Sequence, residues 1–163
     1  MSDTVFKSFL KTPLGIVEVM SDDTYIQSVK FVEEMGVNSL YQPEVIKSCS
    51  IQLLEYFEGE RTDFTIALQQ SGTDFQQQVW RELLTIPFGK TTSYLNLSKQ
   101  LGNAGAIRAV GTTNGKNKIA IIVPCHRVIG SDGKLTGYSG GLLRKQWLLE
   151  HEAKVMGTSN LLF

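Results

Sequence analysis

The spacing of hydrophobic and polar positions changes along the chain, and the change divides the sequence into two parts. Residues 5–10, 16–20 and 25–32 carry short runs rich in β-branched and aromatic side chains. Turn-forming sequences separate them, such as the Thr-Pro-Leu-Gly of residues 12–15. The pattern predicts three strands that follow one another in an antiparallel meander.

Beyond Pro43 the apolar residues recur at helical spacing. One stripe collects Val45, Cys49, Leu53, Tyr56 and Phe57. The pattern stops at Gly59, a typical helix terminator. We therefore predict a helix with Cys49 on its buried face and interpret this cysteine as a packing residue. Residues 64–68 are predicted to form one more strand, and nothing in this part indicates chemistry.

A join is predicted at Ser71-Gly72, which divides the chain into domains 1–72 and 73–163. Thr73 opens the second domain with Gln76 three residues later, the spacing of a helix capping box. The helix that follows has an apolar face made of Phe75, Val79, Trp80, Leu83 and Leu84. The first domain is thus expected to be a scaffold, and the second to be mostly helical.

Two helices joined by a glycine-containing turn come next. Thr92 is the predicted cap of the first, Gly102-Asn103 is the turn, and the second spans residues 104–110 with Arg108 on it. This spacing is typical of a helix-turn-helix, although similar helix pairs occur in enzymes that never bind DNA. The small residues at the start of the second helix would let its backbone approach DNA closely.

A short apolar run at residues 119–123 ends at a proline, and Cys125 follows at once. Its β-branched residues predict a buried strand, after which the proline directs the chain out of the core. The last predicted helix spans residues 142–154 and is expected to turn Leu143 and Trp147 inward.

Composition limits the classes of protein that the chain can be. At 163 residues and 42% hydrophobic content, it holds one large or two small folded domains. No apolar run approaches the roughly 20 residues of a membrane span, and the N-terminus has no signal peptide pattern. Two cysteines and two histidines are too few for a disulfide framework or a structural zinc site. We expect a cytoplasmic protein without metal or cofactor.

The net charge of zero conceals an uneven distribution. Up to Gly72 the chain has five basic and eleven acidic residues, a net charge of −6, and the remainder has the opposite excess. A basic second domain is suited to an anionic partner such as a nucleic acid. A solvated basic face without a partner is the alternative.

Cys125 is the strongest candidate for chemistry. A thiol becomes a nucleophile when a neighbouring cation or base lowers its pKa, and His126 and Arg127 follow it directly. Adjacency in sequence does not establish contact in space. Cys125 as an ordinary small buried residue therefore remains open at this point.

Several motifs nevertheless occur together in one order. They are Pro-Cys-His-Arg-Val-Ile-Gly at residues 124–130, Gly-Tyr-Ser-Gly-Gly-Leu at residues 137–142 and Trp-Leu-Leu-Glu-His-Glu at residues 147–152. From residue 75 to residue 152 the sequence resembles the O6-alkylguanine-DNA alkyltransferases in their stand-alone form. The resemblance implies an α/β (α+β) fold, with a ribonuclease-H-like small sheet plus helix, then a mostly helical, winged-helix-like domain containing the helix-turn-helix.

The resemblance also implies catalytic roles. Cys125 would accept the alkyl group by in-line displacement, and His126 would remove the thiol proton through a water. Glu152 would orient and charge the imidazole, a relay that parallels protease triads. Asn117 would be the hinge between the recognition helix and the Cys125 segment. Tyr94 would press on the phosphate backbone and donate a hydrogen bond as guanine leaves.

The implied partner is double-stranded DNA that contains O6-alkylguanine, bound by a monomer. Arg108 would fill the space left by the flipped base, which must leave the stack to reach the thiol. Tyr94, Ser93, Ala106 and Ala109 would complete the DNA-binding surface.

The substrate pocket implied by the resemblance is formed by Pro124, Val128, Tyr138 and Ser139. O6-alkylguanine is the expected substrate, with O4-alkylthymine as a second. Because a thioether is stable, each molecule would react once, so the protein would repair DNA as a stoichiometric methyltransferase.

The sequence departs from the family pattern in three respects. Lys118 stands where proline is common, Thr112-Thr113 adds bulk, and zinc ligands found in some relatives are missing. Individually, Tyr94 could be helix core and Asn117 a turn residue. Glu152 could be a helix-surface charge paired with Lys154.

Two other classes of protein compete with the alkyltransferase. A non-catalytic lesion-binding relative would lack the cysteine, so Cys125 argues against it. A Cys-His hydrolase would need an oxyanion or acyl pocket, for which the glycine-rich loop is the only signal. The sequence does not indicate which alkyl groups are accepted, how fast they react or whether DNA binding is cooperative.

Overall fold

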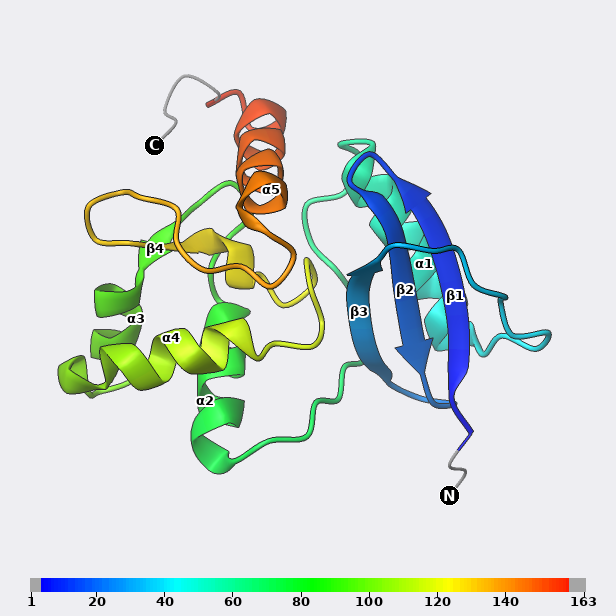
Figure 1. The fold of residues 1–163 in the computed structure, drawn as a ribbon, viewed down its shortest axis with the longest axis horizontal. Helices are drawn as coiled ribbons and strands as arrows, with labels where there is room; N and C mark the ends of the chain where they lie inside the picture. Colours follow the sequence, from blue (N-terminus) through cyan, green and yellow to red (C-terminus); the bar gives the residue numbers. More distant parts are fainter. Residues whose placement is uncertain (1–3, 159–163) are drawn as a thin grey trace. The chain divides into compact units, whose positions relative to one another are not determined.

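The computed structural model describes residues 4–158, and the chain divides into two compact units, Met1–Gln70 and Ser71–Phe163. The first unit begins with strands β1 (Phe6–Thr12), β2 (Gly15–Ser21) and β3 (Ile26–Val32), which pair antiparallel in that order (Figure 1). The predicted meander is therefore confirmed.

A tight turn joins β1 to β2 and sets their register, in which Thr12 pairs with Gly15. Gly15 has a φ of 109°, a region that residues with a Cβ rarely adopt. The Thr12 hydroxyl donates a hydrogen bond to the Gly15 carbonyl at 2.7 Å and holds the turn closed. The turn residues thus keep the alternate valines Val17 and Val19 on the buried face.

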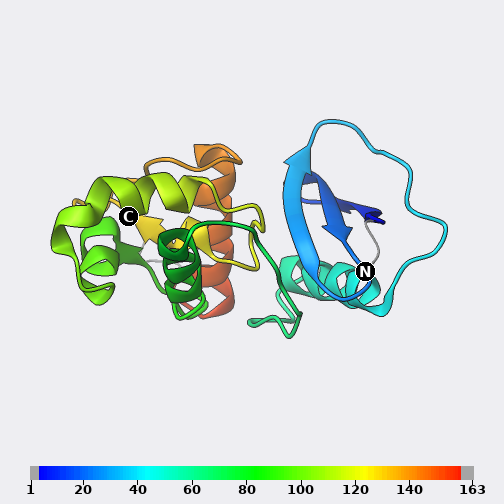
Figure 2. The same ribbon diagram turned by 90° about the horizontal axis from the view of Figure 1, so that it is seen from below.

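Helix α1 (Glu44–Phe57) packs against all three strands and covers one face of the sheet (Figure 2). Its buried stripe contains Ile46, Cys49 and Leu53, each fully inaccessible to solvent. The prediction that Cys49 is a packing residue is therefore confirmed, whereas Val45 is only half-buried.

The strand predicted at residues 64–68 does not form. Only Leu68 makes a bridge, parallel to Ile26 of β3. The reason lies in α1, because the Gln52 side chain accepts a hydrogen bond from the Thr65 amide and donates one to the Thr65 hydroxyl, both at 2.9 Å. The Gln52 side chain therefore binds a backbone amide that a neighbouring strand would otherwise bind.

The second unit opens with α2 (Asp74–Leu83), and the predicted capping box is present. The Thr73 hydroxyl accepts from the Gln76 amide, and the Gln76 side chain accepts from the Thr73 amide. At the other end of the helix, the Trp80 indole donates to the Thr113 carbonyl at 3.1 Å. This bond ties α2 to helix α4.

The helix-turn-helix region comprises α3 (Tyr94–Gln100), the 3₁₀ turn η1 (Ala104–Ala106) and α4 (Ile107–Gly115). The cap of α3 is Ser93, whose hydroxyl accepts from the Asn96 amide at 3.0 Å. The prediction of Thr92 was wrong by one residue. Thr92 and Ser93 both form β4 (Thr92–Ser93), which pairs parallel with β5 (Val128–Ile129), and the helix begins directly after this strand.

Helix α4 also extends five residues beyond the predicted end at residue 110. Gly111 does not stop it, because α4 packs along its length against α2 and α3, and such packing outweighs the low helix propensity of glycine (Figure 1). Residues 112–115 are thereby held near the Cys125 segment.

Helix α5 (Leu142–Val155) is the last helix among the described residues of this unit and packs against the 3₁₀ turn η2 (Cys125–Arg127). The predicted inward face was wrong, since Leu143 is 85% exposed and Trp147 is half-buried against His151. The buried positions of α5 are Lys145, Leu148, Leu149 and Glu152. Among residues 4–158, no helix has the length and apolar character needed to cross a membrane.

Candidate active site

The segment before the cysteine is buried as predicted, but it is a series of turns and the predicted strand is absent. The Val123 amide donates to the Ile119 carbonyl at 3.1 Å, and the Ile122 amide donates to the Ala120 carbonyl at 2.8 Å. The second bond closes a three-residue γ-turn centred on Ile121, which has a φ of 72°. A positive φ at a β-branched residue is strained and is typical of functional segments.

The Asn117 side chain holds these turns together. Its amide nitrogen donates to the Ile119 and Val123 carbonyls, both at 3.1 Å, and its carbonyl oxygen accepts from the Ile119 amide at 3.1 Å. The same nitrogen lies 3.3 Å from the Cys125 sulfur and donates to it. One buried amide therefore shapes the turn and contacts the thiol.

Two further contacts fix the position of Cys125. The Cys125 amide donates to the Val123 carbonyl at 2.7 Å around Pro124, whose φ of −82° and ψ of 60° fit an inverse γ-turn. From α4, the Asn114 side chain donates to the Cys125 carbonyl at 3.3 Å. A hydrogen bond thus links helix α4 directly to the backbone of Cys125.

A buried charge network lies directly behind the cysteine. His126 Nε2 is 2.7 Å from the Glu152 carboxylate, and both side chains are almost fully inaccessible. Arg127 donates to both oxygens of the same carboxylate, at 2.8 and 3.1 Å, and to the Ile86 carbonyl at 2.7 Å. The Gly89 amide adds a bond of 3.0 Å to Glu152. The alternative of Glu152 as a surface charge is therefore wrong.

These contacts set the protonation states of the network. Burial opposes ionisation of Glu152, but the hydrogen bonds and charges of His126 and Arg127 outweigh it and hold the pKa of Glu152 below its ordinary value. Burial lowers the pKa of His126, and Glu152 opposes this only in part. The imidazole is therefore neutral at pH 7, and the ionised carboxylate fixes its proton on Nε2.

The other imidazole nitrogen is free to accept a proton. Nδ1 of His126 is buried and has no hydrogen-bond partner among residues 4–158. In the same part of the chain, no direct hydrogen bond joins the imidazole to the Cys125 sulfur. Residue Cys125 is 3% exposed. Proton transfer between them requires a bridging molecule such as water.

Lys145 of α5 is a further polar group at this site, and sequence reasoning missed it. Its ammonium donates to the carbonyls of Val128 at 2.6 Å, Thr136 at 2.8 Å and Gly137 at 3.5 Å. The Tyr94 hydroxyl donates to the same Thr136 carbonyl at 3.2 Å. Lys145 and Tyr94 together hold residues 128–137 beside the cysteine.

Arg127 was likewise assigned no contact from the sequence, although it donates to both carboxylate oxygens of Glu152. The signal that could have found Lys145 is its spacing. Lys145, Leu148, Leu149 and Glu152 lie at i, i+3, i+4 and i+7 and share one helix face. A lysine that begins an apolar stripe ending in a catalytic candidate is itself a candidate.

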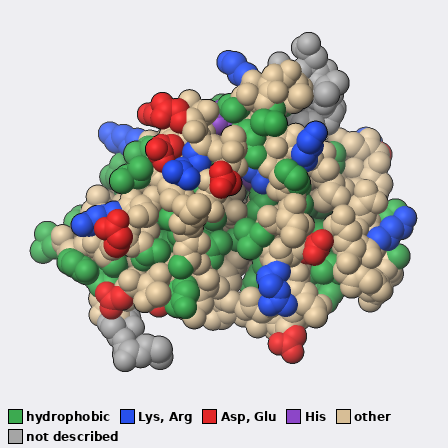
Figure 3. Space-filling view, turned by 180° about the vertical axis from the view of Figure 1, so that it is seen from behind, with side chains coloured by type: hydrophobic (Ala, Val, Ile, Leu, Met, Phe, Trp, Pro, Cys, Tyr) green, Lys and Arg blue, Asp and Glu red, His purple; other side chains and the backbone are tan. Residues whose placement is uncertain are grey.

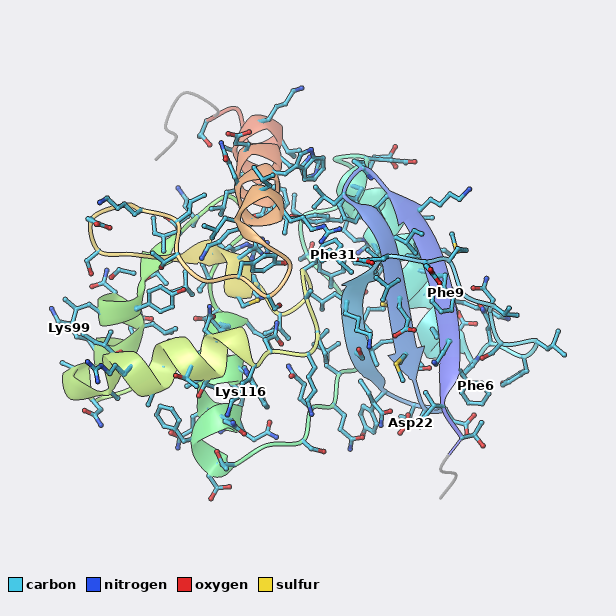
Figure 4. All side chains as sticks on the ribbon, in the orientation of Figure 1. Phe6, Phe9, Asp22, Phe31, Lys99 and Lys116 are labelled. Atoms are coloured by element: carbon cyan, nitrogen blue, oxygen red, sulfur yellow. The ribbon has the colours of Figure 1, made fainter. Side chains whose placement is uncertain are left out.

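The predicted DNA-binding residues lie on and around the helix-turn-helix. Arg108 and Ala109 are exposed on α4, Ala106 is half-buried in η1, and Ser93 and Tyr94 are half-buried at the start of α3. None of these five joins the hydrogen-bond network of Glu152 in the described residues. Lys99 on α3 and Lys116 after α4 add exposed positive charges (Figure 4).

The predicted pocket residues are divided between core and surface. Pro124 and Val128 are buried, whereas Ser139 is exposed. Tyr138 is half-buried, but its hydroxyl is buried and has no partner among the described residues. A polar atom in that state is available to a ligand.

No metal site accompanies these groups in the described part of the chain, where His, Cys, Asp and Glu side chains form no cluster of three or more that could hold an ion. The face drawn in Figure 3 mixes basic and acidic side chains and shows no continuous patch of one sign. The charge difference between the two parts of the sequence is therefore not gathered on that face.

Comparison with known proteins adds an independent line of argument. Residues 5–70 match the family model described as the ribonuclease-like domain of 6-O-methylguanine DNA methyltransferase, and residues 74–154 match its DNA-binding domain. The fold class predicted from the sequence is thereby confirmed.

Individual relatives match over nearly their whole length. A methylated-DNA–protein-cysteine methyltransferase of Mycobacterium leprae is 58% identical over 158 residues, which cover 94% of this chain and 96% of the relative. The Mycobacterium tuberculosis protein of that name is 46% identical over 147 residues, 88% and 89% of the two chains. The crystal structure of M. tuberculosis OGT in complex with DNA superposes with a TM-score of 0.82 at 45% identity, covering 90% of this chain and 92% of that one.

Proposed function

Because the chain belongs to the methylated-DNA–protein-cysteine methyltransferase family, we propose that it repairs DNA by transferring an alkyl group from guanine O6 to Cys125. Its partner is DNA that contains O6-alkylguanine, and the reaction reverses the damage directly. The observation that carries this proposal is the Cys125 thiol, hydrogen-bonded to Asn117 and backed by the His126–Glu152–Arg127 network.

The transfer is a single displacement at carbon. Neutral His126 takes the thiol proton through a water at Nδ1, and Glu152 stabilises the imidazolium that results. The Cys125 sulfur then bonds to the alkyl carbon as the bond from that carbon to O6 breaks. Guanine leaves with the electron pair and is protonated. The thioether product has no leaving group, so each molecule reacts once.

Tyr94 assists the departure of guanine by donating a hydrogen bond to the purine. Its hydroxyl is bonded to the Thr136 carbonyl in the free protein, so it exchanges that acceptor when substrate binds. Burial raises the pKa of Tyr94 and keeps the hydroxyl protonated, which this donor role requires. Asn117 acts as the hinge that transmits movement of α4 to the thiol.

Because the cysteine is buried, the damaged base must leave the duplex to meet it. Arg108 occupies the vacated place in the stack, and Ser93, Tyr94, Ala106 and Ala109 contact the DNA around it. The small side chains of η1 and α4 let the backbone approach the groove, so little sequence preference is expected.

The extruded base is received by Pro124, Val128, Tyr138 and Ser139. The buried Tyr138 hydroxyl, which lacks a partner among the described residues, supports this assignment. O4-alkylthymine presents the same alkyl–oxygen bond on a smaller ring and is the second substrate of the proposal.

Residues 1–72 serve as a scaffold domain and residues 73–163 carry both DNA binding and alkyl transfer, since every proposed site residue lies in the latter range. The protein acts as a monomer. It works in the cytoplasm, where reducing conditions keep the cysteines as free thiols.

Intact-mass measurement after incubation with an O6-methylguanine duplex tests the proposal. A retained gain of about 14 Da, limited to one per molecule, is expected for methyl transfer to protein. Release of unmethylated DNA without a mass change would identify a hydrolase. DNA binding with neither change would identify a non-catalytic lesion-binding protein.

A further inference from the structure

Buried polar atoms without a partner gather around the cysteine in the second unit. Among residues 4–158, His126 Nδ1, the Tyr138 hydroxyl and Asn114 Oδ1 are in this state. The first accepts the thiol proton in the proposed transfer, and the second belongs to the proposed pocket. Asn114 Oδ1 takes part in neither, although Asn114 is only 2% exposed. An acceptor buried without a donor is costly, so a ligand that supplies the donor gains from it.

The amide of Asn114 is oriented by two neighbours. From α4, its Nδ2 donates to the Cys125 carbonyl at 3.3 Å. The reverse orientation would set two acceptor oxygens against each other, so this contact identifies which amide atom is the nitrogen. Burial raises the pKa of Tyr94, and the hydrogen bonds that Tyr94 makes with Thr136 and Asn114 oppose that rise. Since Oδ1 has no partner in the described residues, Nδ2 is the atom that approaches Tyr94.

Oδ1 therefore lies at the place where the extruded base must bind. It shares a carbon with Nδ2, which contacts both the Cys125 carbonyl and Tyr94. In the proposed reaction the alkyl carbon meets the Cys125 sulfur while the purine meets the Tyr94 hydroxyl. Gly111, one turn earlier on α4, would place a Cβ 3.8 Å from the Tyr94 ring, so this face of the helix borders the site.

The chemistry of the substrate limits what Oδ1 can bind. Alkylation at O6 removes the hydrogen from N1 of guanine, and N3 and N7 are acceptors. The exocyclic 2-amino group is then the only hydrogen-bond donor of the base. O4-alkylthymine has no donor, because alkylation removes the hydrogen from its N3. A buried acceptor that is fixed in position therefore distinguishes the two bases.

We propose that Asn114 is a specificity-determining residue, whose Oδ1 accepts a hydrogen bond from the 2-amino group of O6-alkylguanine. The proposal rests on the proposed function and deepens it, because it names the part of the base that the site recognises. A base without the amino group leaves Oδ1 buried and unpaired, which weakens its binding in the transition state. O4-alkylthymine reacts more slowly than O6-alkylguanine for this reason.

The test compares O6-methylguanine with O6-methylhypoxanthine, which differs only in lacking the 2-amino group. Each is placed in the same duplex, and single-turnover transfer is followed by intact mass. The proteins are wild type, Asn114→Leu and Asn114→Asp. Asn96→Leu is the matched control, because Asn96 is exposed on α3. The readout is the ratio of the two rates, in which any general change in DNA binding or thiol reactivity cancels.

In Asn114→Leu, the preference for O6-methylguanine should fall about tenfold, as expected for one buried hydrogen bond. Asn114→Asp loses the donor to the Cys125 carbonyl but keeps an acceptor oxygen, so it should retain most of the wild-type ratio even if both rates fall. Asn96→Leu should retain all of it. An unchanged ratio in Asn114→Leu overturns the proposal. An equal fall in the Leu and Asp variants also overturns it, because Asn114 would then act only through its donor to Cys125.

A second measurement decides the matter if Asn114→Leu does not fold. The unreactive Cys125→Ser protein, labelled with ¹³C-asparagine, is bound to each of the two duplexes, and the side-chain carbonyl carbon of Asn114 is followed by NMR. A hydrogen bond to Oδ1 deshields this carbon. Its resonance should therefore lie at higher frequency with O6-methylguanine than with O6-methylhypoxanthine, and equal positions contradict the proposal.

Failure of the proposed function is seen separately. Wild-type protein that gains no mass from the O6-methylguanine duplex contradicts alkyl transfer itself. Transfer at a normal rate, with a ratio that does not depend on Asn114, contradicts only the role of this residue.

Discussion

The two cysteines of the chain are both buried, yet their surroundings differ in kind. Cys49 lies on the inner face of α1 with 0% exposure, and burial raises its pKa to about 12 with no opposing contribution. Cys125 is 3% exposed, but its sulfur accepts a hydrogen bond from Asn117. Burial raises the pKa of Cys125, and this hydrogen bond and the charge of Lys145 oppose the rise. Burial alone makes an inert thiol.

The secondary structure around each cysteine explains the difference. In α1, the backbone donors and acceptors are satisfied within the helix, so Cys49 can be surrounded by apolar side chains alone. Around Cys125 the chain makes successive γ-turns, and the side chains of Asn114, Asn117 and Lys145 bind the backbone groups that a helix or strand would pair. One of these side chains, the amide of Asn117, also donates a hydrogen bond to the Cys125 sulfur.

The largest expected effect comes from exchanging each thiol for a hydroxyl. Cys125→Ser should abolish alkyl transfer, because a serine hydroxyl is far less acidic than a thiol and no thiolate can form. DNA binding should remain, since no proposed phosphate contact is removed. Cys49→Ser should keep the wild-type transfer rate while losing about 1–3 kcal/mol of stability for a buried hydroxyl. Transfer is measured as ³H-methyl counts retained on protein.

Loss of transfer in Cys49→Ser, at a temperature where it is folded, would erase the contrast between the two cysteines. Substantial transfer by Cys125→Ser would likewise contradict the contrast, because the reaction would then not need the Cys125 thiol.

A smaller effect is expected when the polar surroundings of Cys125 are altered and the thiol is kept. Glu152→Gln leaves Arg127 without a counter-charge and His126 without an ionised acceptor. Transfer should slow about 100-fold through the loss of general-base assistance, and stability should fall by about 3–5 kcal/mol. Single-turnover kinetics and urea unfolding measure the two. Glu150→Gln, two residues earlier on α5, is the matched control and should change neither.

A substitution at Arg108 tests access of the damaged base to the thiol without changing the reactivity of the thiol. Arg108 is exposed on α4 and, in the described residues, is not part of the hydrogen-bond network of Glu152. Arg108→Ala should slow transfer from duplex O6-methylguanine about tenfold, because extrusion of the base loses its substitute in the stack. Transfer from free O6-benzylguanine should be unchanged. The ratio of the two rates is the readout, and equal slowing of both would refute the role in flipping.

The smallest effect is a difference in acid stability. The pKa of Glu152 is lower in the folded protein than its unfolded value of about 4.3, so its stabilising contribution is present above that pH and declines as the pH falls through the folded pKa. Below about pH 4, the free energy of unfolding of wild type should therefore fall more steeply than that of Glu152→Gln, by up to about 1.4 kcal/mol per pH unit.

Tryptophan fluorescence is a suitable probe for this measurement, because both tryptophans, Trp80 and Trp147, lie in the second unit with Glu152. If the free energy of unfolding falls equally with pH in wild type and in Glu152→Gln, ionisation of Glu152 does not stabilise the folded protein.

Several features could be predicted from the sequence because local rules determine them. The capping box of Thr73 and Gln76, the turn at Gly15 and the burial of Cys49 each follow from a short pattern of residues. Cys125 and His126 stand out from the sequence itself, whereas the roles of Glu152 and Asn117 were found only through a resemblance.

Other features depend on contacts between distant residues. The run at residues 119–123 has the composition of a strand, but the Asn117 amide folds it into turns, and apolar composition cannot distinguish a buried strand from a buried turn. Leu143 was predicted inward because it is apolar, whereas Lys145 takes the buried position because carbonyls of Val128, Thr136 and Gly137 accept its donors. The apolar or polar character of one residue does not predict these outcomes, because they depend on hydrogen bonds to residues elsewhere in the chain.

The most direct measurement of the central claim is to locate the transferred methyl group. After incubation with an O6-[¹³C]methylguanine duplex, peptide mass spectrometry of the whole chain should place the label on Cys125, in a ratio approaching one per molecule, with none on Cys49. Label on Cys49, or on any residue outside the Cys125 peptide, would contradict the account, because the polar contacts that distinguish the two buried thiols would then not determine which one reacts.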